Sequence, residues 1–355
     1  MSQKKALIAM SGGVDSSVAA YLMQRAGFDC SGAIMRLHDY KTENASDDVE
    51  DARRVAGKLA MPFHVIEAKK EFDEKVIQNF ISCYECGLTP NPCVQCNRYL
   101  KFDLFLQQAM DLGCDTIVTG HYARIRYDEA TGRYLLLKAA DTSKDQSYVL
   151  YCLTQAQLAH TAFPLGELTK DQARSIAEEK GFVTARKKDS QDICFVPDGD
   201  YVAFMERYTG KQYMPGDYLD QSGKVVGRHR GAVCYTLGQR KGLNLAMGAP
   251  VYVCAKDMDK NTVTVGPNEA LFARTLVADS WNWIPFPSLE APMRVNARAR
   301  YNQKEQPATV YPGENGTARV VFDQPQRAMT PGQAVVLYDG DMVVGGGTII
   351  GVIND

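Results

Sequence analysis

The stretch that decides the fold is Ala6-Leu-Ile-Ala-Met10-Ser11-Gly12-Gly13-Val14-Asp15-Ser16-Ser17. Its first five residues form a short apolar run, which is typical of a buried parallel strand. The glycine pair then predicts a tight turn, and Val18, Leu22 and Ala26 follow at helical spacing until Gly27 ends the helix. The sequence therefore predicts a strand, a glycine turn and a helix in direct succession.

The same alternation continues through the first half of the chain. Further strands are expected at residues 32–37, 63–67 and 116–119, and helices at 47–59, 71–86, 97–112, 155–160 and 170–181. Strands that alternate with helices predict an α/β domain built on a doubly wound parallel sheet. We assign this domain to residues 1–198.

Beyond residue 198 the pattern changes to short alternating runs that are separated by turn signals. Residues 251–255 and 262–265 predict a hairpin, which residues 258–261 would close. Prolines around residues 281–292 divide this part of the chain, so two small β-rich domains are expected, of the barrel or sandwich type. We assign them to residues 199–272 and 273–355.

The composition limits the classes of protein to which this chain can belong. It has 355 residues, of which 45% are apolar and 23% charged, with a net charge of −2. No apolar run is long enough to span a bilayer, and residues 6–10 are too short a run for a secretion signal. We therefore expect a cytoplasmic protein with no membrane partner. In that compartment, ten cysteines indicate reactive thiols, metal ligands or buried thiols rather than a disulfide framework.

The loop at residues 10–17 suits phosphate binding. Glycines let several backbone N–H groups converge on an anion, and the following helix adds its partial positive charge. The hydroxyls of Ser16 and Ser17 are further candidate donors, and Asp15 suits a loop that holds pyrophosphate with Mg²⁺. No Gly-Lys-Ser/Thr follows, so the loop is not a Walker A motif. The alternative is a plain strand–helix turn in which Asp15 or Ser16 caps the helix.

Two Cys-x-x-Cys pairs stand close together, Cys83 with Cys86 and Cys93 with Cys96. Four such thiols can bind zinc, but the gap between the pairs is shorter than in common zinc ribbons. Residues 89–92, Thr-Pro-Asn-Pro, predict an extended loop that faces solvent. A helix that starts at residue 97 would put Cys96 near its N-terminus, where a lowered pKa favours the reactive thiolate. Cys194 is a third candidate.

A net charge near zero means that any nucleic-acid partner must be held by local basic patches. Residues 293–304 alternate cleanly, with an apolar face opposite a basic face that includes Arg298 and Arg300. Such a half-buried strand could contact phosphates, although an ordinary solvated face explains the pattern equally well. Residues 227–231 and 240–242 are two more basic loops.

Several motifs resemble those of known proteins. The segment Ser-Gly-Gly-Val-Asp-Ser-Ser at residues 11–17 resembles the loop of the ATP pyrophosphatase superfamily, whose members cleave ATP between its α and β phosphates and adenylate a substrate. The other motifs resemble the MnmA-type tRNA-uridine 2-sulfurtransferases, and they cover nearly the whole chain in order. These motifs are Asn91-Pro92-x-x-x-Cys96-Asn97-Arg98-x-x-Lys101-Phe102, Thr119-Gly120-His121-Tyr122-Ala123-Arg124, Lys144-Asp145-Gln146-Ser147-Tyr148, Ser190-x-x-Ile193-Cys194-Phe195, the run at 235–243, Arg300-Tyr301 and Pro331-Gly332-Gln333-Ala334-Val335.

The resemblance implies an enzyme with a catalytic α/β domain, a small central domain and a C-terminal β-barrel. It would use ATP and Mg²⁺ to thiolate the wobble uridine of the tRNAs for Lys, Glu and Gln. Cys96 would be the nucleophile, and Cys194 would carry a persulfide sulfur supplied by a cysteine desulfurase or by a sulfur-relay protein. Sulfide is the alternative sulfur donor. Asp15 would assist catalysis. The ATP site would comprise Ala9, Met10, Ser11, Gly12, Gly13, Val14, Asp15, Ser16, Met35 and Gly120.

The resemblance also implies a set of residues that contact RNA. Asn91, Pro92 and Cys93 would meet the target base. The remaining tRNA contacts would be made by His121, Lys144, Asp145, Gln146, Arg300, Tyr301 and Gln333.

Two residues depart from the family pattern. Ala9 stands where glycine is frequent, at a strand end where the change is minor. Cys93 stands where many members have aspartate, so that Cys93, Cys96 and Cys194 would surround one pocket. Three thiolates could instead hold a [4Fe–4S] cluster whose fourth iron delivers sulfide, with no persulfide and no Cys96–Cys194 disulfide.

Two other classes of function remain open on the sequence. One is an ATP pyrophosphatase that amidates or ligates a small molecule, for which Cys96, Cys194 and basic β domains would be unnecessary. The other is a non-catalytic, zinc-stabilised RNA-binding module, for which the glycine loop would be unnecessary.

Overall fold

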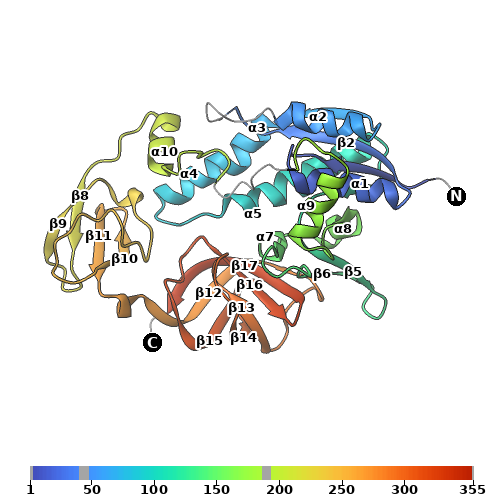
Figure 1. The fold of residues 1–355 in the computed structure, drawn as a ribbon. Coiled ribbons are helices and arrows are strands. Elements are labelled where there is room, and N and C mark those ends of the chain that lie inside the picture. Colours follow the sequence, from blue (N-terminus) through green and yellow to red (C-terminus); the bar gives the residue numbers. More distant parts are fainter. Residues whose placement is uncertain (1–2, 40–47, 186–192, 354–355) are drawn as a thin grey trace.

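The computed structural model describes residues 3–39, 48–185 and 193–353. Three sheets organise this part of the chain: a parallel sheet near the N-terminus, a four-stranded sheet, and a barrel that ends at the C-terminus (Figure 1). None of the helices in the described residues is long and apolar enough to cross a membrane.

The first sheet has the strand order β3-β2-β1-β4-β7, and every pairing in it is parallel. Buried residues alternate between its faces, since Ala6 and Ile8 pack in the cluster that holds α1, α2 and α9 while Leu7 packs with α6. Helices therefore cover both faces, which confirms the doubly wound α/β fold. Its strands are β1 (Lys5–Ala9), β2 (Asp29–Arg36), β3 (Phe63–Glu67), β4 (Thr116–Val118) and β7 (Thr161–Ala162).

The helices of the N-terminal half follow the predicted segments with shifted ends. They are α1 (Val14–Arg25), α2 (Asp48–Lys58), α3 (Lys69–Phe72), the π-helix η1 (Asp73–Ile77), α4 (Gln78–Glu85), α5 (Pro92–Cys96), the π-helix η2 (Asn97–Leu104), α6 (Phe105–Asp111), α7 (Ser147–Leu150), α8 (Gln155–Ala159) and α9 (Lys170–Glu179).

One helix boundary differs from the expectation in a way that affects the cysteines. The helix expected at residues 97–112 begins five residues earlier, because α5, η2 and α6 run on without a break from Pro92. The side chain of Asn91 accepts a hydrogen bond from Val94 N–H at 3.4 Å, and Pro92 occupies the first helical position. A proline there costs no hydrogen bond, so the helix begins at the last residue of the segment predicted as a loop, whereas residues 89–91 have no regular secondary structure, as predicted.

The central sheet has the order β10-β11-β8-β9. Its strands are β8 (Gly216–Leu219), β9 (Val225–His229), β10 (Tyr252–Asp257) and β11 (Thr262–Gly266), and the short helices around it are α10 (Tyr201–Thr209), η3 (Ala232–Cys234) and η4 (Asn268–Leu271). The antiparallel β10–β11 pair confirms the hairpin expected at residues 251–265.

The C-terminal sheet closes on itself, because β12 pairs with β17 as well as with β15. Its six barrel strands are β12 (Phe272–Trp283), β13 (Met293–Arg298), β14 (Gln306–Pro312), β15 (Ala318–Arg327), β16 (Ala334–Asp339) and β17 (Met342–Ile353). A hairpin that the sequence patterns did not predict, β5 (Arg124–Asp128) with β6 (Arg133–Leu137), reaches from the α/β domain and pairs with β17 at Met342. The α/β domain and the barrel are thus joined by backbone pairing.

Candidate functional site

The strand order reverses between β1 and β4, and the loops that follow these two strands meet. A Cβ added to Gly120 would lie 2.8 Å from Ser16 N and 2.9 Å from the carbonyl carbon of Asp15, so only glycine permits this approach. Met35 lies near the carboxyl end of the adjacent strand β2. The predicted nucleotide residues at positions 9–16, 35 and 120 therefore gather at the edge where open α/β sheets bind ligands.

The serine hydroxyls of the glycine loop face inward. Ser17 Oγ donates to Gly13 O at 2.8 Å, and Ser16 Oγ accepts from Ser11 N–H at 3.1 Å. Both serines are buried, so they hold the loop in shape, and backbone N–H groups are left as the donors for an anion. The alternative in which Asp15 or Ser16 caps the helix is wrong, because Gly13 is the N-cap and no side chain caps α1.

Asp15 is held by two residues that the sequence patterns did not select for this role. Lys170 Nζ lies 2.8 Å from both carboxylate oxygens, and the Tyr122 hydroxyl donates to Oδ1 at 2.9 Å. Lys170 is 5% exposed and stands at the first position of α9, behind the Thr169 capping box. Because 155 residues separate Lys170 from Asp15, no local pattern could have revealed the pair.

The cysteines sit on different parts of one site. Cys93 is exposed in the first turn of α5, Cys96 is buried at the end of that helix, and Cys194 is exposed. Cys96 therefore stands beyond the first turn, and the expected pKa-lowering position at a helix N-terminus is wrong for it. Residues 89–92 also do not all face solvent, because Pro90 and Pro92 are buried.

Burial raises the pKa of Cys96, opposed by the nearby Lys101 ammonium and reinforced by Cys93. Cys194 keeps solvent access, yet the protein packed around its thiol removes water that would stabilise the thiolate. This desolvation raises the pKa of Cys194, and charge on Cys96 and then Cys93 raises it further. The three thiols thus lie close enough to influence one another's charge, and both Cys96 and Cys194 are mainly protonated at neutral pH.

The metal-site alternatives depend on whether these thiols converge. Within residues 3–39, 48–185 and 193–353, no three His, Cys, Asp or Glu side chains gather closely enough to hold a metal ion. Neither a four-cysteine zinc site nor a three-cysteine cluster site is therefore preformed in this part of the chain. Ser190, which belongs to one of the quoted motifs, lies outside the described residues.

His121 follows β4 and packs against the rings of Phe102 and Phe163, whose centroids are 5.7 and 6.0 Å from its own. Its Nδ1 forms a 2.8 Å hydrogen bond with Thr119 Oγ1. Burial, and then the Lys101 ammonium, hold the pKa of His121 well below its usual range. His121 is therefore a neutral imidazole at pH 7. The charge of Lys101 lowers the pKa of His121 at this edge of the sheet and also opposes the rise in the pKa of Cys96.

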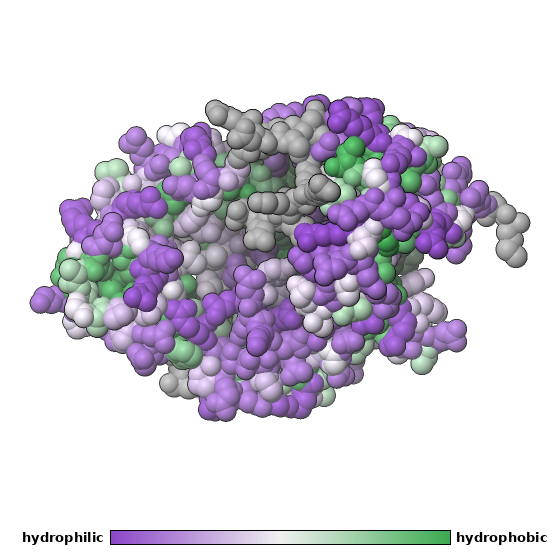
Figure 2. All heavy atoms as spheres, viewed as in Figure 1, coloured by the Kyte–Doolittle hydropathy of each residue, from purple (hydrophilic) through white to green (hydrophobic). Residues whose placement is uncertain are grey.

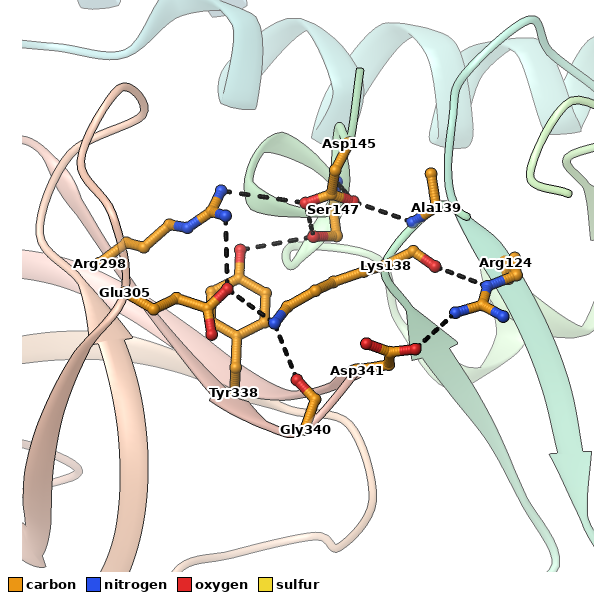
Figure 3. A network of polar contacts seen from close by, with 10 residues as sticks. All are labelled: Arg124, Lys138, Ala139, Asp145, Ser147, Arg298, Glu305, Tyr338, Gly340 and Asp341. Atoms are coloured by element: carbon orange, nitrogen blue, oxygen red, sulfur yellow. Dashed lines mark hydrogen bonds and ion pairs between the residues drawn. The ribbon is translucent and has the colours of Figure 1, made fainter. Parts of the chain in front are cut away.

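Asp145, one of the residues expected to contact RNA, lies where the barrel meets the α/β domain (Figure 3). Asp145 is buried, and its carboxylate accepts from Ala139 N–H, from Ser147 N–H and from the Ser147 hydroxyl. Gln146 accepts from Tyr122 N–H at 3.0 Å, and Lys144 is half-buried. The side chains of Asp145 and Gln146 thus hold residues 122, 139 and 147 in place through hydrogen bonds inside the protein.

Some arginine side chains on the basic face of β13 form ion pairs within the protein. Arg298 lies 3.9 Å from Asp145 Oδ2 and 3.3 Å from Glu305 Oε1, and Lys138 Nζ lies 2.7 Å from the same Glu305 (Figure 3). The expectation that Arg298 faces phosphates is therefore wrong, because two carboxylates of the domain junction already hold it. Arg294 pairs with Asp323 at 2.8 Å, whereas Arg300 is exposed.

Tyr301 is the most accessible aromatic side chain beside the cysteines. It is 42% exposed, and its ring contacts that of Tyr148 edge-on at 5.6 Å. Burial raises the pKa of Tyr301, and the negative charges of Asp145 and Cys93 raise it further. The Tyr301 hydroxyl is therefore within electrostatic range of Cys93. Gln333, also expected at the RNA surface, donates its amide to two carbonyl oxygens of the loop before Cys93.

Comparisons with known proteins agree with this arrangement. Three family models match the chain: the tRNA methyl transferase HUP domain at residues 4–198, the tRNA methyl transferase PRC-barrel domain at 202–267, and the aminomethyltransferase beta-barrel domain at 273–349. Among solved structures, a 4-thiouridine synthetase–RNA complex with bound ATP has a TM-score of 0.38 at 16% identity and covers 58% of this chain and 50% of that one. Those values are too low to support an inference about activity.

Curated relatives are much more similar. The tRNA-specific 2-thiouridylase MnmA of Clostridioides difficile is 47% identical over 355 residues, with 98% of each chain covered. The protein of the same name from Acetivibrio thermocellus is 48% identical, covering 98% of this chain and 100% of its own. This chain belongs to the MnmA family of tRNA-specific 2-thiouridylases.

Proposed function

We propose that this protein uses ATP to replace O2 of the wobble uridine of tRNA with sulfur, acting on the tRNAs for Lys, Glu and Gln. The observation that carries this proposal is that a glycine loop suited to phosphate and a set of interacting thiols belong to one domain and are linked through the charge of Lys101. Lys101 links the two parts, since its charge acts on His121 after β4 and on Cys96 in α5. Such a pairing suits activation by adenylation followed by sulfur transfer.

The first step forms a bond between uridine O2 and the α-phosphate of ATP and breaks the α–β phosphoanhydride, so that pyrophosphate leaves. Backbone N–H groups at the start of α1 would hold its oxygens, and Lys170 would supply a positive charge beside Asp15. Asp15 offers a carboxylate there, which suits Mg²⁺, an ion that takes one or two carboxylates and completes its shell with phosphates and water. When bound, Mg²⁺ would neutralise charge on the leaving pyrophosphate.

The second step replaces the adenylated oxygen. The terminal sulfur of a persulfide on Cys194 attacks C2 of the base, and AMP departs with the former O2. Cys96 thiolate then attacks the Cys194 sulfur, which breaks the S–S bond and leaves 2-thiouridine and a Cys96–Cys194 disulfide. A dithiol reductant must restore both thiols, and a cysteine desulfurase or sulfur-relay protein must reload Cys194.

The [4Fe–4S] alternative would require Cys93, Cys96 and Cys194 to converge as ligands of one cluster. These cysteines do not form a metal-ligand group in the described residues, so they do not fit the cluster as arranged. We therefore favour the persulfide mechanism, in which iron takes no part. Cys93 is exposed in the first turn of α5, and it would meet the flipped base together with Asn91 and Pro92.

The RNA would be held by the junction between the barrel and the α/β domain. Tyr301 offers an exposed ring on which a base could stack, and Arg300 offers an unburied charge beside it. The surface over the barrel is largely hydrophilic in the view of Figure 2. We place the reaction in the cytoplasm, where the tRNA substrate is found.

The proposal is tested by nucleoside mass spectrometry of tRNA from a strain that lacks the protein, and by assay of the purified enzyme. We expect 2-thiouridine to disappear from the mutant and to return with the gene.

Anaerobically purified protein should be colourless and free of iron, should thiolate from a persulfide donor, and should exchange ATP with pyrophosphate only when tRNA is present. Exchange that depends on a small molecule instead of tRNA would favour the amidating or ligating alternative, and a brown protein that loses iron and activity on Cys93→Ala would favour the cluster.

Arg300 gives a prediction about RNA binding. Arg300→Gln should weaken tRNA binding and lower the slope of log K against log salt by roughly 0.7–0.9, because one phosphate contact releases about that much counterion. Arg294→Gln on the same barrel is the matched control and should leave the slope unchanged, since Arg294 already pairs with Asp323. Equal slopes for wild type and Arg300→Gln would mean that this part of the barrel does not touch the RNA backbone.

A further inference from the structure

The loop that precedes the cysteine helix is bound by the barrel as well as by its own domain, in which Leu88 N–H donates to Cys83 O at 2.8 Å. This loop, residues 88–91, connects α4 to α5 and contains Pro90, with Pro92 following it. Because proline has no backbone N–H, the loop has few donors with which to build internal hydrogen bonds. Its carbonyl groups therefore need donors from elsewhere in the chain.

The turn at residues 330–333 supplies those partners. The amide of Gln333 donates to Thr89 O at 3.0 Å and to Pro90 O at 3.1 Å. In the reverse direction, Thr89 N–H donates to Pro331 O at 2.9 Å. Three hydrogen bonds thus join a catalytic-domain loop to a barrel turn more than two hundred positions away in the sequence.

The barrel turn is itself rigid and shaped to receive the loop. Gly332 N–H donates to Ile349 O at 2.8 Å, and Ile349 N–H donates to Gln333 O at 2.8 Å, which ties the turn to β17 on both sides. Gly332 has a φ of +91°, and a Cβ at this position would lie 2.9 Å from both Thr89 N and Thr89 O. A side chain here would push the loop away, so glycine serves both the backbone conformation and the approach.

The contact bears on chemistry because the cysteine helix begins directly after the loop. Asn91 caps α5, Cys93 is exposed in its first turn, and Cys96 lies at its end. A shift of the loop would be transmitted to the start of α5, because only Asn91 separates Pro90 from the first helical residue. Displacements of about 1 Å in a reacting group can cost on the order of 100-fold in rate.

We propose that Gln333 is a positioning residue, which clamps the cysteine helix to the barrel and so sets the placement of Cys93 and Cys96. Its side-chain nitrogen already donates to two protein carbonyls, so in this proposal Gln333 acts through the loop rather than by donating to tRNA. The barrel then completes the catalytic site in the free protein, in addition to holding RNA. The kinetic part of this inference rests on the proposed thiolation, but the clamp itself does not.

The test begins without tRNA or ATP, by hydrogen exchange on the full-length protein. Gln333→Met keeps the length of the side chain and removes its donors, and we expect amides in residues 83–96 to exchange about tenfold faster or more. Gln333→Lys restores a donor of similar reach and should return exchange toward wild type. Gln324→Met, at an exposed glutamine of the same barrel, is the matched control and should change nothing. Unchanged exchange in residues 306–327 would show that the barrel of each variant is folded.

The second measurement is single-turnover thiolation at saturating tRNA. For Gln333→Met we expect the rate to fall about tenfold or more while the Kd for tRNA stays within about twofold of wild type. Gly332→Ala should reproduce both effects by displacing the loop sterically. Normal exchange with a weakened Kd would overturn the clamp and make Gln333 a direct RNA contact. Faster exchange in a protein whose wild type never thiolates tRNA would support the clamp and reject the proposed function.

Discussion

Cys96→Ala and Cys194→Ala should each abolish multiple-turnover thiolation, with a loss of at least ~10³-fold. The reason is that each thiol takes part in a bond that forms or breaks during sulfur transfer. ATP–pyrophosphate exchange should survive in both variants, because adenylation precedes the sulfur step. The measurements are tRNA mass spectrometry and radiolabelled pyrophosphate exchange. Cys86→Ser, at an exposed cysteine at the C-terminal end of α4, is the control and should thiolate normally.

The same thiols give a pH dependence whose sign follows from their environment. Burial raises the pKa of Cys96 above its ordinary value of 9.0, so its thiolate is a minor species at pH 7. The rate of persulfide resolution should therefore rise by roughly tenfold per pH unit from pH 7 toward the elevated pKa. A rate that is flat over this range would mean that Cys96 is not the attacking thiolate, or that another step limits turnover; pre-formed adenylate in a single-turnover assay separates these two.

Asp15→Asn should destabilise the protein by about 2–3 kcal/mol and abolish adenylation. Lys170 is almost fully buried, and removing its partner leaves a buried charge uncompensated, which costs about 3–5 kcal/mol in a fully buried pair. We expect a smaller value because the Asp15 side chain is 32% exposed. Urea unfolding measures the first effect and ATP–pyrophosphate exchange the second.

A double variant separates structure from chemistry at this pair. Asp15→Asn with Lys170→Met removes both charges, so stability should recover toward wild type while adenylation stays absent. Glu179→Gln on the same helix breaks an exposed pair with Lys180 and should change stability by less than about 0.5 kcal/mol. Recovery of adenylation in the double variant would contradict a role for either charge at the pyrophosphate.

The sequence by itself determined the α/β fold, because that fold depends on local patterns. The apolar run at residues 6–10, the glycine pair and the helical spacing after them each specify their own conformation. Alternation at period two likewise specified the hairpin at residues 251–265. The loop at residues 10–17 could be selected as a phosphate site from its glycines and its place between a strand and a helix, whereas Gly120 entered the predicted nucleotide site only through the family resemblance.

The long motifs carried the family resemblance, but they could not specify which side chains face ligand and which face protein. Asp145 lies in the same motif as Lys144, yet its carboxylate is buried under three hydrogen bonds from the residues around it. Arg298 and Arg300 share one face in the alternating pattern, and only the ion pairs of Arg298 with Asp145 and Glu305 at the domain junction distinguish them.

Tertiary structure alone decided the environment of each functional group. Lys170 meets Asp15, and Gln333 meets residues 89–90, across separations of 155 and more than 240 residues, where sequence spacing carries no information. The thiol of Cys96 was expected to be acidified by a helix end, but the helix starts earlier and the thiol is buried, which raises its pKa. Charge, burial and the partners of a side chain are properties of the packed chain, because they depend on which distant segments exclude water from it.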